Sequence, residues 1–225
     1  QRQMCIRDRS MSDFRTNPYG NLSEFGAFGD RIFLAMDQNE LYKGCLLVSA
    51  PDIRDEMFSR CIVYLFEYDQ TQGAFGVILN EQSEVSVHDV LPAFAPYCST
   101  PASLFIGDPV EQERVTGLLR LKPHCPIDLS ILRPVYGRTF LMDPTPNAVQ
   151  RMQDISESYR LYMGYCAWQP GQLEDEIRRG DWYVCDAHDN DFGTDHHTDL
   201  YAQIVRRQPW PLNLYASRPV DPRLN

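Results

Sequence analysis

Apolar residues from Leu41 onward fall into short runs that are separated by turn residues, and most of these runs have the length of a β-strand. The first run ends before Pro51, because proline restricts the residue before it and cannot donate to a β-ladder. The pattern predicts strands over residues 45–49, 61–68, 74–80, 104–107, 115–121, 139–142, 159–165 and 182–185.

The second and third of these strands are predicted to form a β-hairpin, since the loop between them, residues 69–73, ends in a glycine. If Tyr68 faces Ala74 across the hairpin, Asn80 lies opposite Ile62 at the far end. Apolar residues occupy both faces of the two strands, so each face needs cover. The hairpin is therefore predicted at the centre of a sheet.

Helical signals are fewer than strand signals. Ser86 is a favourable N-cap, and Pro146 costs nothing in a first helical turn. Gly180 supplies a left-handed stop after the most amphipathic of the helices. Helices are predicted over residues 86–91, 145–157, 170–179 and 199–207. Many strands with a few helices predict an α+β fold.

The length and composition favour one main domain. The chain has 225 residues, 43% of them hydrophobic, which is enough apolar surface for a core without disulfides or a structural metal. Residues 1–30 lack any hydrophobic periodicity and are predicted to be a disordered tail. Within it, residues 1–10 are interpreted as a non-native scar, since Met11 is a plausible start. Residues 31–225 are predicted to form a single domain.

Charge and cysteine usage narrow the possible partners and location. The chain has 21 Lys and Arg against 31 Asp and Glu, and a net charge of -10 disfavours direct binding to nucleic acid. Its seven cysteines include no CxxC pair and mostly lie in apolar runs, as is typical of buried thiols in a reducing compartment. No secretory signal and no run of membrane-helix length is found. We therefore expect a cytoplasmic protein that does not bind membranes.

Motifs that carry chemistry are mostly absent from the sequence: it has no phosphate-binding glycine loop, no HExxH and no GxSxG elbow. His124 adjoins Cys125, but adjacency is weak support for a catalytic pair, and the cysteines are interpreted as core residues. His188, His196 and His197 are weak candidates for metal ligands, because their spacing fits no usual zinc pattern. We predict neither a metal nor a cofactor.

The most unusual segment is residues 164–177, in which a strand turns through Trp168 into a helix. The free amides at the start of such a helix can receive an anion. The other interpretation is a tight junction in which the indole packs and a glycine avoids a clash. The candidate pocket residues are Glu67, Asn80, Gly107, Trp168, Gly171, Gln172, Glu174 and Glu176.

The same segment resembles the signature of the YqgE/AlgH family, Gly-x-x-Gly-Trp-x-x-Gly-Gln-Leu-Glu-x-Glu-Ile followed by Trp. Ala167 stands where the family often has glycine, and Tyr68 replaces a frequent histidine. Three further segments match in the same order, within residues 46–64, 73–80 and 107–110, and the ending resembles the actinobacterial branch. The matching residues of the signature are Gly164, Trp168, Gly171, Gln172, Leu173, Glu174, Glu176, Ile177 and Trp182.

The resemblance implies a compact α+β protein with a mainly antiparallel, partly barrel-like sheet flanked by a few helices. It also implies a family without an established biochemical role, some members of which are described as transcriptional regulators. The leading interpretation is a non-catalytic regulatory or binding protein with an unknown protein or small-molecule partner. The alternative is an enzyme with a pocket around Trp168 that uses Glu67 as an acid or base. Direct DNA binding ranks third, because no helix-turn-helix is found.

Overall fold

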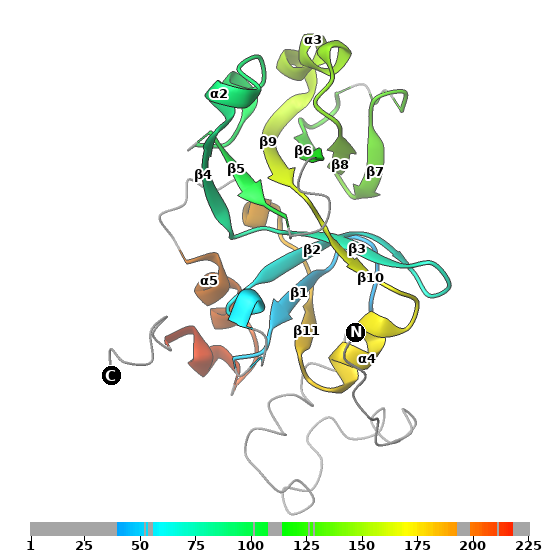
Figure 1. Ribbon diagram of the computed structural model, residues 1–225, viewed down its shortest axis with the longest axis vertical. Helices are drawn as coiled ribbons and strands as arrows, with labels where there is room; N and C mark the ends of the chain where they lie inside the picture. The colour runs from blue at the N-terminus through cyan, green and yellow to red at the C-terminus, as the bar shows by residue number, and fades with distance from the viewer. Residues whose placement is uncertain are drawn as a thin grey trace, which may run out of the picture.

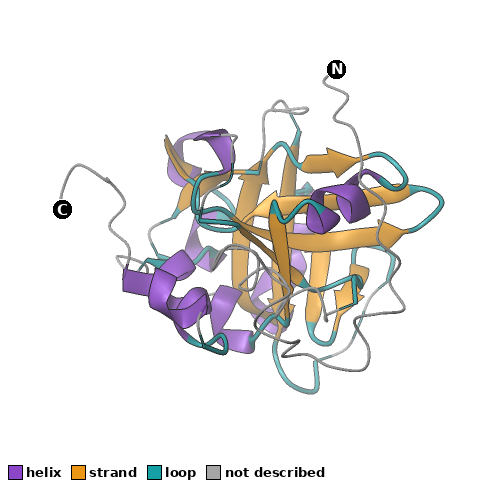
Figure 2. Ribbon diagram, turned by 90° about the horizontal axis from the view of Figure 1, so that it is seen from below, coloured by secondary structure: helices purple, strands orange, loops and turns teal. Residues whose placement is uncertain are grey.

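The computed structural model describes residues 40–51, 53, 56–100, 102–107, 114–125, 127, 129–192, 199–210 and 212–217. In this part of the chain, eleven strands form two sheets, and short helices pack against them (Figures 1 and 2). The predicted α+β class is confirmed. Each sheet has two outer strands, so neither closes into a full barrel. The predicted tail lies outside the described residues.

The first sheet has five antiparallel strands in the order β10-β3-β2-β1-β11. The β2–β3 hairpin lies at its centre, as predicted. Ile62 and Tyr64 of β2 are buried on one face, and Val63 and Leu65 are buried on the other. The strands are β10 (Cys166–Trp168), β3 (Gly73–Ile78), β2 (Ile62–Asp69), β1 (Leu46–Ser49) and β11 (Trp182–Cys185).

The register of the hairpin differs from the prediction at one end. Tyr68 faces Ala74, as predicted. A β-bulge in the middle of β2 adds one residue to that strand, however, and shifts the pairing beyond it. Leu79 therefore takes the place opposite Ile62 that was predicted for Asn80, and its amide donates to the carbonyl of Ile62 at 2.7 Å.

The second sheet has six strands in the order β4-β5-β9-β6-β8-β7, and only its β5–β9 pair is parallel among the named strands. The outer strands β4 and β7 were not predicted, because β4 is polar and β7 carries Pro134. The predicted strand 159–165 is also wrong at its end, since Gly164, with a φ of 73°, separates β9 from β10. The strands are β4 (Gln82–Ser86), β5 (Ser103–Ile106), β9 (Ser156–Met163), β6 (Val115–Leu121), β8 (Thr139–Met142) and β7 (Arg133–Tyr136).

All four predicted helices are present, with shorter bounds. The side chains of Ser86, Thr145 and Asp199 cap three of them by accepting a backbone N–H. The fourth begins after Gly171, whose φ of 79° is left-handed, and Gly180 follows it with a φ of 83°. The helices are α2 (Val87–Val90), α3 (Pro146–Ile155), α4 (Gln172–Arg178) and α5 (Leu200–Arg206), and the 3-10 turns are η2 (Glu56–Phe58), η3 (Ala95–Tyr97), η4 (Asp189–Phe192) and η5 (Leu212–Ser217).

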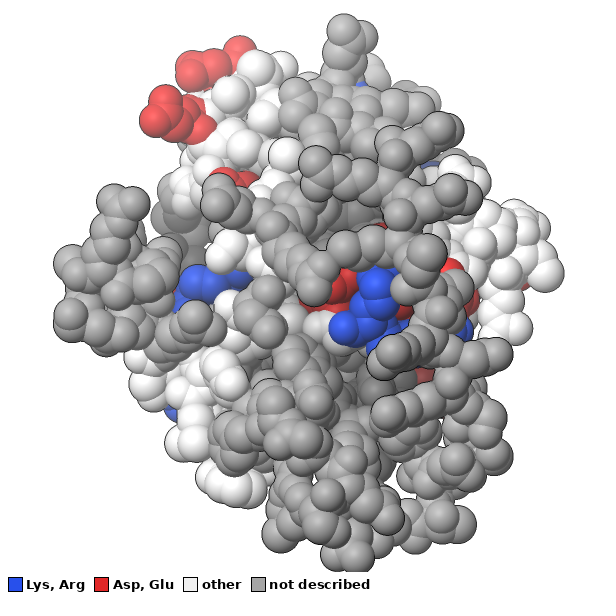
Figure 3. Space-filling view, turned by 60° about the horizontal axis from the view of Figure 1, so that its bottom comes forward, with Lys and Arg blue, Asp and Glu red and all other residues white. Residues whose placement is uncertain are grey.

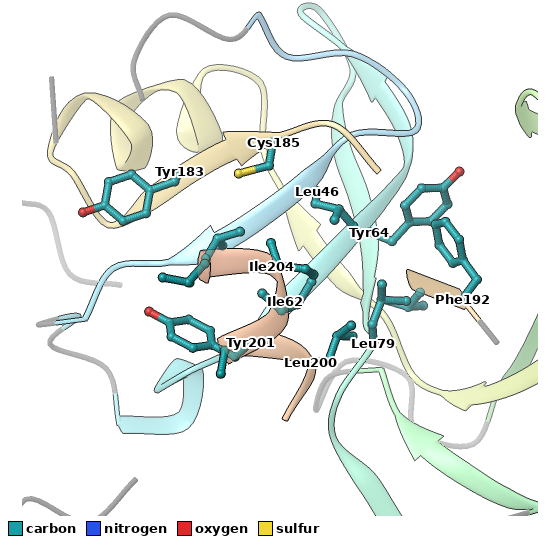
Figure 4. Packing of buried hydrophobic residues seen from close by; sticks show 14 of the residues in the cluster. Leu46, Ile62, Tyr64, Leu79, Tyr183, Cys185, Phe192, Leu200, Tyr201 and Ile204 are labelled. Atoms are coloured by element: carbon teal, nitrogen blue, oxygen red, sulfur yellow. The ribbon is translucent and has the colours of Figure 1, made fainter. Parts of the chain in front are cut away.

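Three apolar clusters hold these elements together. The largest joins the two sheets and includes α5, whose Leu200 and Ile204 pack among Leu46 and Ile62 (Figure 4). A second cluster lies between the six-stranded sheet and α2 and α3. The third fills the outer face of the five-stranded sheet beneath α4. Among the described residues, no helix is long and apolar enough to cross a membrane.

Candidate functional site

The carboxylate of Glu176 on α4 is the centre of the predicted pocket segment. Its Oε2 accepts hydrogen bonds from the indole Nε1 of Trp168 at 2.8 Å and from that of Trp182 at 2.9 Å. Its Oε1 accepts a third bond from the Gln172 side-chain amide at 3.0 Å. Both oxygens are therefore engaged by donors of the protein itself.

The local sequence explains this arrangement. β10 ends at Trp168, and the left-handed Gly171 turns the chain into α4. Gln172 and Glu176 stand four residues apart, so their side chains meet on one face of the helix. The Gln172 Oε1 also accepts the backbone N–H of Gln169 at 3.0 Å. The side chain of Gln172 thus fixes the turn as well as the carboxylate.

The two indoles that meet at Glu176 are themselves part of the core. Trp168 is 6% exposed and Trp182 is 3% exposed. Their rings meet edge to face, with centroids 6.3 Å apart and an interplanar angle of 85°. Phe58 also packs against Trp182, edge to face, at a centroid distance of 5.5 Å. The ring packing and the hydrogen bonds together attach α4 to the five-stranded sheet.

A second carboxylate of α4 is engaged in the same way. The hydroxyl of Tyr68 on β2 donates to Glu174 Oε1 at 2.8 Å. Burial, together with this hydrogen bond, raises the pKa of Tyr68 to about 12. Glu174 therefore links α4 to the central hairpin.

Glu67, the acid or base that the enzyme alternative requires, lies away from this group. Tyr68 reaches α4, and successive side chains of a strand point to opposite faces, so Glu67 points to the other face of the sheet. Its carboxylate is 51% exposed and forms an ion pair with Lys43 at 2.8 Å. The structure thus does not bring Glu67 and Glu176 together.

Asn80 secures the far end of β3. Its Oδ1 accepts the backbone N–H of Ile62, and its Nδ2 donates to the carbonyl of Arg60, both at 2.8 Å. Arg60 has a φ of 56°, which is unusual for a residue other than glycine. Asn80 therefore holds a left-handed turn in place at the start of β2.

Gly107 lies where the two sheets meet. Its N–H donates to Met163 at 2.7 Å, and its carbonyl accepts the N–H of Ile78 at 3.3 Å. A Cβ at this position would stand 2.1 Å from the carbonyl oxygen of Gly164. Glycine is required here because the two backbones pass so close together. Whether any of the predicted pocket residues also binds a ligand stays a prediction.

The weak metal candidates do not assemble into a site in the part that the structure describes. The amide of His188 donates to Asp191 Oδ2 at 2.7 Å. Asp191 is 4% exposed and pairs with Arg207 through both carboxylate oxygens, at 2.7 and 2.8 Å. His196 and His197 lie outside the described residues. No group of three or more His, Cys, Asp or Glu side chains among the described residues could hold a metal.

The six described cysteines are free thiols, and four of them are buried. Burial raises the pKa of Cys45 to about 11 and that of Cys185 to about 12. A raised pKa keeps these thiols protonated at neutral pH, where they are poor nucleophiles. The interpretation of these residues as core packing is supported by their burial.

Sequence reasoning missed an apolar hollow on the six-stranded sheet. Its volume is about 540 Å³, and it lies between β4, α2 and the start of α3. In the sequence the hollow is signalled only by Val85 and Val90, two apolar residues in a largely polar stretch, because the other walls come from distant segments. The hollow is lined by Val85, Val90, Leu91, Leu104, Val115, Asp143, Pro144, Thr145 and Met163.

Comparison with known proteins agrees with the fold and the signature. The sequence pattern of the AlgH-like family matches residues 46–213. A UPF0301 protein of Corynebacterium efficiens is 38% identical over 207 residues, which cover 91% of this chain and 100% of that protein. A UPF0301 protein of Rhodococcus jostii is 37% identical and covers 81% of this chain and 90% of its own length.

Solved structures give the same result. The crystal structure of protein DIP2367 from Corynebacterium diphtheriae superposes with a TM-score of 0.77 at 33% identity, covering 85% of this chain and 100% of that one. The solution structure of AlgH from Pseudomonas aeruginosa, at 22% identity, has a TM-score of 0.58 and shares the fold, covering 82% of this chain and 98% of that one. With a family pattern that spans most of the chain and relatives this similar, the protein belongs to the AlgH-like, UPF0301 family.

Proposed function

We propose that this protein is a non-catalytic, cytoplasmic binding protein whose regulatory effect comes from holding a protein partner. This proposal rests on the hydrogen bonds that the carboxylate of Glu176 accepts. Both oxygens of its carboxylate accept hydrogen bonds from the protein, so the most distinctive polar residues of the chain stabilise a helix–sheet junction. A general acid or base needs an oxygen that can reach a substrate proton.

The surface that we assign to the partner is the apolar hollow beside β4. Val85 is 38% exposed and Val90 is 49% exposed, so apolar side chains of the hollow face solvent. β4 is also an outer strand of its sheet. A partner segment in extended conformation can pair with such an edge and place alternate side chains in an adjoining hollow. The occupant that fits is therefore an extended protein segment with two apolar side chains at alternate positions.

Charge supports a protein partner over DNA. The chain carries a net charge of -10, and a DNA-binding surface needs a concentrated basic patch. On the face shown in Figure 3, described Lys and Arg side chains gather in separate small groups, and acidic side chains border the largest of them. An effect on transcription would then pass through another protein.

Peptide display on the full chain tests the proposal. Peptides enriched on the wild type are measured by fluorescence anisotropy against Val85→Lys and Val90→Lys, which place a charge in the hollow. Met57→Lys is the matched control, because Met57 is 61% exposed and does not line the hollow. We expect at least about tenfold weaker binding by the two hollow variants, since burying an unpaired lysine is unfavourable, and unchanged binding by the control.

Two results would contradict the proposal. Selection that enriches no peptide, or peptides that bind both hollow variants as tightly as the wild type, would remove the hollow as the binding surface. Robust turnover in a broad hydrolase screen that is lost in Glu176→Gln would instead favour the enzyme alternative.

A further inference from the structure

Arg160 on β9 is the most buried arginine of the described residues, with 4% of its surface exposed. Its guanidinium lies over the ring of Phe105, 4.3 Å from the centroid. One nitrogen, Nη1, donates to the carbonyl of Leu79 at 3.1 Å. Phe105 and Leu79 both belong to the cluster that joins the two sheets, so a positive charge sits in the apolar seam between the sheets.

The described part of the chain supplies no carboxylate to this charge. Arg120, the next most buried arginine at 7% exposure, pairs with Glu157 at 3.2 Å. Arg207 pairs with Asp191. For Arg160 the described residues provide a carbonyl, an aromatic face and the neighbouring hydroxyl of Tyr162, and its Nε has no hydrogen-bond partner. A buried cation without a counter-ion, and a buried N–H without an acceptor, are both unfavourable.

A second buried polar group lies beside it. Tyr162 stands two residues further along β9 and therefore on the same face of the sheet. It is 1% exposed, and no group of the described residues accepts the proton of its hydroxyl. Burial raises the pKa of Tyr162, and both the charge of Arg160 and a hydrogen bond from Arg160 to the hydroxyl act in the opposite direction.

We propose that Arg160 and Tyr162 form an internal binding site for a small monovalent oxyanion such as a carboxylate. The site lies in the seam between the two sheets. The free Nε–H donates to one oxygen of the anion, and the Tyr162 hydroxyl donates to it as well. Phe105 covers the face of the guanidinium and leaves its edge for the anion. A single positive charge is neutralised by a single negative one, which excludes a dianion.

This binding site is independent of the hollow beside β4, because neither Arg160 nor Tyr162 lines the hollow. Arg160 bonds to Leu79, which follows β3 of one sheet, from a strand of the other sheet. An anion bound to Arg160 therefore stabilises the contact between the sheets.

Nuclear magnetic resonance of the full chain labelled with 15N-arginine tests this proposal. The Arg160 Nε–H signal is assigned by its loss in Arg160→Lys, or, if that variant does not fold, by its proximity to the Phe105 ring protons. The probe is sodium formate, with sodium chloride at equal ionic strength as the reference. We expect the signal to shift saturably with formate and to stay in place with chloride.

Two tyrosine variants make the test specific. Tyr162→Phe removes one donor and is expected to weaken formate binding about threefold to tenfold, the effect of one hydrogen bond. Tyr136→Phe makes the same chemical change on a ring that is 60% exposed and should leave the affinity unchanged. The proposal is overturned if the Nε–H signal ignores formate, follows chloride equally, or responds with the same affinity in Tyr162→Phe.

Discussion

The indole Nε1 of Trp168 donates to Glu176 Oε2 at 2.8 Å across the turn that joins β10 to α4. The same oxygen accepts the indole N–H of Trp182 at 2.9 Å, so one carboxylate oxygen serves two buried rings. This contact makes the signature segment a structural joint, and it can be tested through stability.

Glu176→Gln is expected to lower the free energy of unfolding by about 1–3 kcal/mol. The amide retains one acceptor oxygen, but its NH₂ group faces donors that then lack an acceptor. Urea unfolding followed by tryptophan fluorescence measures the change. Asp175→Asn on the same helix is the control, since its pair with Arg178 is exposed and should contribute less than about 1 kcal/mol. Equal stability of Glu176→Gln and the wild type would show that the network contributes little.

Substitution by alanine should lower the free energy of unfolding more at Gly107 than at Gly171. A Cβ on Gly107 would stand 2.1 Å from a backbone oxygen, so we expect a loss of about 3 kcal/mol or more. A Cβ on Gly171 meets nothing within 4 Å, and only its left-handed φ of 79° opposes alanine, which costs about 1–2 kcal/mol. Thermal unfolding of the two variants checks the order. The reverse order would mean that backbone strain outweighs the clash.

Asn80→Ala is expected to destabilise the protein by about 1–3 kcal/mol, because the carbonyl of Arg60 and the amide of Ile62 each lose a partner. The amide of Ile62 should also exchange faster with deuterium. Gln82→Ala is the control, since Gln82 is exposed and its side chain makes one bond, to Ser103 at 3.0 Å. Unchanged exchange at Ile62 would contradict the role assigned to Asn80.

The sequence predicts those elements whose signals are local. Caps such as Ser86 and Asp199 bond to amides within their own helices, so their position in the chain is enough to place a helix start. The central hairpin was found because both of its faces are apolar. Outer strands such as β4 have no such pattern, since one edge of the strand faces solvent and not a second strand. The β-bulge in β2 depends on pairing with β3 and is not visible in either strand alone.

The site is predictable to the same extent. Gln172 and Glu176 are four residues apart, so their contact follows from helical geometry. The donors from Trp182 and Tyr68 arrive on other strands, and only the fold brings them to α4. The prediction that placed Glu67 in this pocket fails on the side of the sheet, because Tyr68 reaches α4 and Glu67 pairs with Lys43 on the other face. The walls of the apolar hollow include residues of β4, β5, β6 and β9, and only the topology of the whole sheet brings these strands together.

Cys45 and Cys185 should resist alkylation in the folded protein. Burial raises their pKa values to about 11 and about 12, so both thiols stay protonated at pH 8. Peptide mapping after iodoacetamide treatment should find them unmodified in the native state and fully modified in urea. The half-buried Cys125 provides the internal comparison and should react before them. Native labelling of Cys45 or Cys185 at the rate seen in urea would restore the catalytic-cysteine alternative.

Tyr68 should make stability fall in alkaline solution. Its hydroxyl donates to Glu174, and burial with this bond raises its pKa from the ordinary value of 10.0 to about 12. A pKa that is higher in the folded state favours the folded protein while the hydroxyl is protonated in both states. That contribution is complete below pH 10 and is lost as the pH rises toward 12.

The comparison of Tyr68→Phe with the wild type isolates this effect. The variant has no hydroxyl to ionise, so its melting temperature should decline less steeply between about pH 10 and pH 12 than that of the wild type. Tyr136→Phe, at a ring that is 60% exposed, should keep the wild-type slope. Identical slopes for Tyr68→Phe and the wild type would mean that the Tyr68 hydroxyl ionises as readily in the folded chain as in the unfolded one, and would remove the bond to Glu174 as a link between α4 and the hairpin.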